Sequence, residues 1–76
     1  MSPSPLPVVS GRAAVRAFEK AGWIVARHRA SHIALIKPGI PVNLSNPDHK
    51  QLDRGLLRAQ IRRAGLTVDE FVALLK

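Results

Sequence analysis

The chain has 76 residues, which suffices for one small domain but not for a large enzyme scaffold such as a barrel or a doubly wound sheet. It contains no cysteine, which excludes disulfides and thiolate chemistry and favours a reducing, cytoplasmic setting. Twelve Lys and Arg residues oppose five Asp and Glu, and the net charge of +7 indicates a polyanionic partner, with an anionic membrane surface as the alternative. No apolar run approaches the ~20 residues that span a bilayer.

The first half of the chain predicts one helix followed by strands. Residues 1–9 are rich in proline and predict a flexible or extended lead-in, and residues 10–76 form a single predicted domain. Ser10 is a suitable N-cap, and the apolar spacing after it predicts a helix over residues 11–21 that Gly22 ends. Residues 23–28 and 31–37 predict an antiparallel hairpin, and residues 40–44 predict a third strand at a sheet edge.

The second half predicts a loop and two helices. Residues 45–48 predict the loop, in which Asp48 is interpreted as a helix cap, with an acid/base pair of Asp48 and His49 as the alternative. A helix follows over residues 52–64, and Thr67 with Glu70 fits the capping box of a third helix that runs to Leu75. The order α-β-β-β-α-α predicts a two-layer α+β fold with a three-stranded antiparallel sheet and all helices on one face. Without its last helix, this is the order of the double-stranded RNA-binding domain.

Ser31-His32 is the first candidate for chemistry. By alternation Ile33 and Leu35 point to the core, so that His32 points out of the open sheet face, with Arg27 and Arg29 flanking it across the hairpin. A histidine can accept the proton of an RNA 2′-hydroxyl while arginines bind the phosphate. The alternative is a surface histidine without a chemical role.

Basic residues elsewhere predict contacts to phosphate. Arg54, Arg58 and Arg62 recur every four residues and form one ridge along the second helix, which could follow a phosphate backbone or simply be a solvated face. Lys50 is a possible phosphate contact in the preceding loop, and Ser31 and Lys37 complete the predicted RNA-contacting set. No metal site is expected, because no carboxylate joins His28 and His32.

Several short motifs occur in order along the chain. They are Ser10-Gly11, Ala21-Gly22-Trp23, Ser31-His32, Pro47-Asp48-His49-Lys50, Gly55 with Leu57-Arg58, and Ala64-Gly65-Leu66-Thr67. Together they make the chain resemble the HicA (YcfA-like) toxins of toxin–antitoxin pairs, from Ser10 to about Leu75.

The resemblance implies a fold like the double-stranded RNA-binding domain and a metal-independent, cofactor-free endoribonuclease, an mRNA interferase that inhibits translation. It implies one catalytic histidine, which corresponds to His32, and a HicB-like antitoxin that covers it; the toxin alone is expected to be monomeric. Ala30 stands where the family has a glycine, and alanine is expected to resist a positive φ at this turn. The rival hypotheses are a non-catalytic reader of double-stranded RNA and a protein whose sheet mainly docks a partner.

Overall fold

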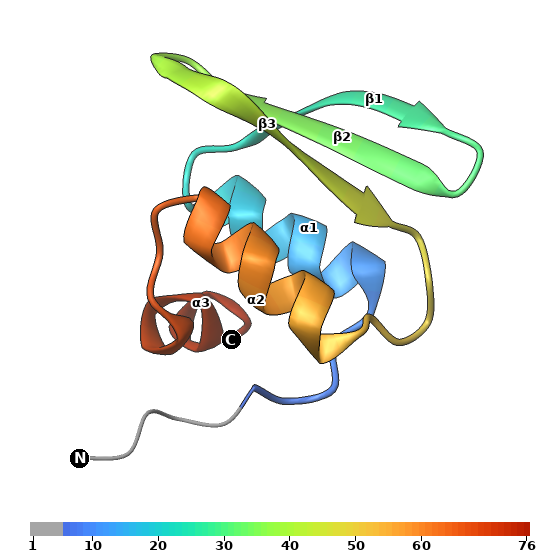
Figure 1. The fold of residues 1–76 in the computed structure, drawn as a ribbon, viewed down its shortest axis with the longest axis vertical. Coiled ribbons are helices and arrows are strands. Elements are labelled where there is room, and N and C mark those ends of the chain that lie inside the picture. The colour runs from blue at the N-terminus through green and yellow to red at the C-terminus, as the bar shows by residue number, and fades with distance from the viewer. Residues whose placement is uncertain (1–5) are drawn as a thin grey trace.

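The computed structural model describes residues 6–76. Its element order is α1 (Gly11–Lys20), β1 (Ile24–Arg29), β2 (His32–Lys37), β3 (Ile40–Pro47), α2 (Arg54–Arg63) and α3 (Val68–Leu74). The strands form one antiparallel sheet in the order β1-β2-β3, and the three helices lie on one side of it (Figure 1). The α+β fold predicted from the sequence is therefore confirmed, and β3 is an edge strand as predicted.

Local sequence signals set the helix boundaries. The Ser10 side chain accepts a hydrogen bond from the amide of Ala13 at 3.1 Å, and Gly22 ends the turn after α1 with a φ of 100°. The predicted capping box is present in both directions at α3, between Thr67 and Glu70. These three signals lie within a few residues of the boundaries they determine, which is why the sequence predicts them.

Two boundaries differ from the prediction by more than one residue. β3 continues to Pro47, so residues 45–47 are paired with β2 instead of forming a loop. α2 begins at Arg54 and is capped by the Asp53 side chain, which accepts from the amide of Leu56 at 3.0 Å; Asp48 is therefore not the cap. Pairing with the central strand holds residues 45–47 extended in spite of their preference for turns.

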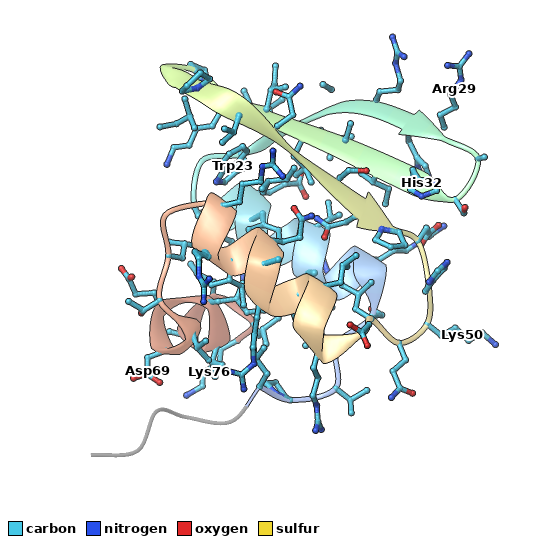
Figure 2. The ribbon with its side chains drawn as sticks, in the orientation of Figure 1. Trp23, Arg29, His32, Lys50, Asp69 and Lys76 are labelled. Carbon is cyan, nitrogen blue, oxygen red and sulfur yellow. The ribbon has the colours of Figure 1, made fainter. Side chains whose placement is uncertain are left out.

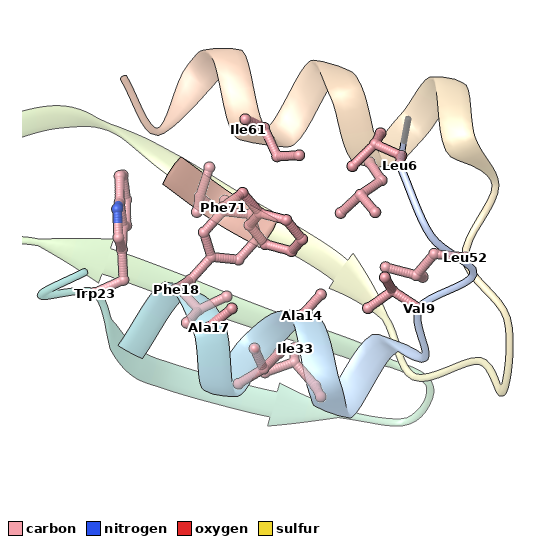
Figure 3. Close-up of a cluster of buried hydrophobic side chains, with 14 residues drawn as sticks. Leu6, Val9, Ala14, Ala17, Phe18, Trp23, Ile33, Leu52, Ile61 and Phe71 are labelled. Atoms are coloured by element: carbon pink, nitrogen blue, oxygen red, sulfur yellow. The ribbon is translucent and has the colours of Figure 1, made fainter. Parts of the chain in front are cut away.

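The core lies between the sheet and the helices. Phe18 of α1 and Phe71 of α3 are fully buried with their ring centroids 5.1 Å apart, in a tilted arrangement favourable for aromatic pairs. Leu6 and Val9, which belong to the predicted lead-in, are buried beside Leu52 at one end of the core, with Trp23 at the other (Figure 3). Residues 1–5 lie outside the described residues. Within residues 6–76, every helix is too short or too polar to cross a bilayer.

Candidate functional site on the open sheet face

His32 lies on the face of the sheet that carries no helix. Along β2, Ile33 and Leu35 are 4% and 0% exposed, whereas His32 and Ile36 are exposed. The alternation predicted for this strand is therefore confirmed. The Cα partners of His32 are Arg29 on β1 and Pro47 on β3.

Arginines flank His32 on the same face. Cross-strand partners project to the same side of a sheet, so the pairs Arg29–His32 and Arg27–Ala34 place both guanidinium groups on the open face. Arg27, Arg29 and His32 are all exposed. An imidazole and two cations thus share a surface that a large polyanion can reach.

The turn before His32 has an unusual backbone. Ala30 adopts a φ of 52°, in the left-handed region that an L-residue enters only at a cost, so this alanine takes the positive φ in spite of its resistance to it. A two-residue hairpin with a positive φ at its first central position favours glycine there. The direct pairing of Arg29 with His32 closes the hairpin around Ala30 and Ser31 and imposes this conformation.

Segments far apart in the sequence meet next to His32. The amide of Asp48 donates a hydrogen bond to the carbonyl of Ser31 at 2.6 Å. The amide of Gly11 donates to the carbonyl of His49 at 2.8 Å, and the amide of Leu52 donates to the carbonyl of Val9 at 2.8 Å. The β1–β2 turn, the segment after β3 and the start of α1 therefore gather at one end of the molecule. Figure 2 shows Arg29, His32 and Lys50 at this end, with Asp69 and Lys76 at the opposite end.

Asp48 holds this end together. Its carboxylate accepts hydrogen bonds from Arg12 of α1, at 3.2 Å from Nε and 3.4 Å from Nη2, and lies 3.7 Å from Nε2 of His28 on β1. Sequence reasoning missed this role because Arg12 and Asp48 are 36 positions apart and share no local pattern. His28 is the Cα partner of Ile33, so His28 faces the helix side and does not lie with His32.

The predicted RNA-contacting residues do not form one surface. Arg54, Arg58 and Arg62 are exposed along α2, which lies on the helix side of the sheet (Figure 1). Each step of four residues advances about 6 Å along the helix, so the ridge leads away from the His32 end. Lys37 lies apart from His32, because its Nζ donates to the carbonyl of Ala21 at 2.9 Å and so stabilises the end of α1.

The chemistry available on the open face is proton transfer and anion binding. An exposed imidazole can exchange protons with a bound hydroxyl, and neighbouring guanidinium groups can stabilise charge on a phosphate. Among residues 6–76, no group of three His, Asp or Glu side chains is arranged to hold a metal ion.

Comparison with known proteins identifies the family of this chain. A family model described as the HicA toxin of bacterial toxin–antitoxin systems matches residues 11–66, from the first residue of α1 to just beyond α2. No curated protein sequence and no solved structure matches the chain. The match covers most of the chain, including the strand that carries His32, and the chain belongs to the HicA toxin family of bacterial toxin–antitoxin systems.

Proposed function

We propose that this protein is a metal-independent endoribonuclease that cleaves mRNA and thereby inhibits translation in the cytoplasm. The observation that carries the proposal is the placement of His32, exposed on the uncovered sheet face and paired directly with Arg29. Membership of the HicA toxin family supports the same conclusion.

His32 is the proposed catalytic residue. In RNA cleavage the 2′-hydroxyl attacks the neighbouring phosphorus, a new P–O bond closes a cyclic phosphate, and the bond to the 5′-oxygen of the next nucleotide breaks. The imidazole of His32 accepts the proton of the attacking hydroxyl as general base, and a proton from water or from the imidazolium goes to the leaving oxygen. Arg27 and Arg29 stabilise the negative charge that develops on the phosphoryl oxygens.

The other proposed phosphate contacts begin near His32 and continue along α2. Ser31 and Lys50 are exposed beside the hairpin turn and after β3, and Arg54 opens α2 directly after that segment. Arg58 and Arg62 lie progressively farther along α2, where a longer RNA could reach them. Lys37 is left out of the proposed interface because its ammonium group is engaged by the Ala21 carbonyl.

A HicB-like antitoxin is the proposed protein partner of the open face. Ile24 and Ile36 are Cα partners on this face, and they are 52% and 40% exposed. A partner that covers the sheet would bury this apolar pair and His32 together, which both stabilises the complex and blocks RNA.

The test is cleavage of a long RNA in EDTA by the wild-type protein, His32→Ala and His49→Ala. His49 is an exposed histidine in the segment after β3, and it serves as the matched control. We expect cleavage by the wild type and His49→Ala, and a loss of about 10²-fold or more for His32→Ala. Equal cleavage by all three would disprove the assignment of His32. Absence of cleavage with RNA still bound at low salt would support the non-catalytic reader instead.

A further inference from the structure

A hollow of about 340 Å³ lies on the helix side of β1, near the His32 end of the molecule. It exists because α1 covers only part of the inner face of the sheet. All six residues of β1 are exposed, although Val25 faces the helix layer as the Cα partner of the fully buried Leu35. α1 therefore covers the inner face of β2 but leaves the inner face of β1 open. The hollow between α1 and β1 is lined by Arg12, Val15, Arg16, Val25, His28 and Ile33.

The lining of the hollow combines an apolar surface with a cationic rim. Val15 and Ile33 are 7% and 4% exposed, and Val25 adds a partly exposed apolar wall. Arg12 and Arg16 reach the hollow from one face of α1, because residues four apart lie above one another on a helix. Arg12 and His28 both contact Asp48. Arg16, the other arginine of the rim, forms no ion pair within residues 6–76.

We propose that this hollow binds one base of single-stranded RNA, with Arg16 against the base or its phosphate. The proposal rests on the proposed ribonuclease function and specifies its substrate class. A volume of about 340 Å³ lies near the lower limit of about 300 Å³ for small-molecule sites, which suits a single base. Bases that are splayed out of single strands stack on aromatic or histidine rings and on guanidinium planes, and this lining offers the ring of His28 and the guanidinium group of Arg16 beside apolar walls.

The position of the hollow relative to His32 supports single-stranded RNA. Two lining residues of the hollow, His28 and Ile33, are Cα partners across the hairpin. The next pair toward the turn is Arg29 with His32, and its side chains point to the other face of the sheet. The hollow and the proposed catalytic residue therefore lie on opposite faces of the sheet, and among residues 6–76 only β1 lies between His32 and the nearer sheet edge. An RNA that contacts both faces must bend sharply around β1, which a flexible single strand does far more readily than a stiff duplex.

Binding is tested in the His32→Ala protein, which keeps the RNA intact. The affinity for a ten-nucleotide single-stranded RNA is measured in EDTA for His32→Ala alone and with Arg16→Ala or Arg63→Ala added. Arg63 is an exposed arginine of α2 outside the hollow, so it controls for the loss of one charge. We expect Arg16→Ala to weaken binding about fivefold or more and Arg63→Ala less than about twofold. Equal effects of the two changes would overturn the proposal.

The methyl groups of the hollow report where the base binds. When the same RNA is added, we expect NMR shifts for the methyls of Val15, Val25 and Ile33, and smaller shifts when ribose 5-phosphate, which has no base, replaces the RNA. Shifts confined to residues of the open face would overturn the proposal that the hollow binds a base, but they would leave the proposed ribonuclease function intact. If Arg16→Ala weakened only antitoxin binding, the hollow would belong to the protein partner and the proposal would be wrong.

Discussion

The two faces of the sheet differ sharply although they are built from the same strands. On the inner face, Leu35 and Leu44 are Cα partners and both are fully buried beneath the helices. On the outer face, His32 and Arg29 are partners and both are exposed. A strand that alternates at every residue can therefore supply the core and the candidate site together.

This difference teaches where each kind of substitution should act. The inner face contributes apolar area removed from water, which is the main source of stability in so small a domain. The outer face carries charged side chains and an imidazole, and it removes little apolar area from water. Changes on the inner face should alter the free energy of unfolding, and changes on the outer face should alter RNA chemistry with little change in folding.

The largest expected effect compares adjacent residues of β2. We expect Leu35→Ala to lower the free energy of unfolding by about 2–5 kcal/mol, because it leaves a cavity in the core. Ile36→Ala, on the outer face, should cost less than about 1 kcal/mol. Urea unfolding followed by the fluorescence of Trp23, the single and buried tryptophan, measures both. Similar losses for the two variants would show that the faces are not energetically distinct.

A smaller effect is expected at the turn that joins β1 to β2. Ala30→Gly removes the strain of a left-handed alanine, and we expect a gain in unfolding free energy of about 1 kcal/mol. RNA cleavage should be preserved, because the Arg29–His32 pairing that positions the site stays the same. Thermal unfolding monitored by circular dichroism shows whether Ala30→Gly raises or lowers the stability. A lower melting temperature for Ala30→Gly would contradict the left-handed turn.

The smallest expected effect separates the His32 end from the far end of α2. If Arg29 contacts one phosphate, Arg29→Ala should reduce the slope of log affinity against log salt by about 1. Arg62→Ala, far along the ridge, should leave the slope for a short RNA unchanged. Affinity for a short RNA at several salt concentrations gives both slopes. A larger effect of Arg62→Ala would place the RNA on α2 instead of on the open face.

The sequence predicts those features that depend on residues close together in the chain. The alternation of His32, Ile33 and Leu35 determines which side chains face the core, and the capping box at Thr67 determines where α3 begins. The open face and its histidine follow from these local patterns. Family resemblance adds the expected role of His32, which local patterns do not provide.

The features that the sequence did not predict depend on contacts between distant residues. The sequence predicts Asp48 to be a helix cap, but its partners Arg12 and His28 come from other elements. The sequence places Asn46 in a loop, but pairing with β2 makes it fully buried. The sequence groups Lys37 with the RNA contacts, but its ammonium group donates to a carbonyl at the end of α1. The hollow beside β1 was also missed, because it arises from how far α1 extends over the sheet.

The most direct test of the account compares two histidines on opposite faces of the same hairpin. His32 lies on the open face and His28 on the helix side, near Asp48. The rate of RNA cleavage at saturating RNA is measured in EDTA for His32→Ala and His28→Ala, with circular dichroism to confirm that both fold. The account predicts a loss of about 10²-fold or more for His32→Ala. His28 lines the hollow, so His28→Ala should change at most the affinity for RNA and leave the rate at saturating RNA unchanged. Loss for His28→Ala with cleavage retained by His32→Ala would place the chemistry on the helix side and contradict the account.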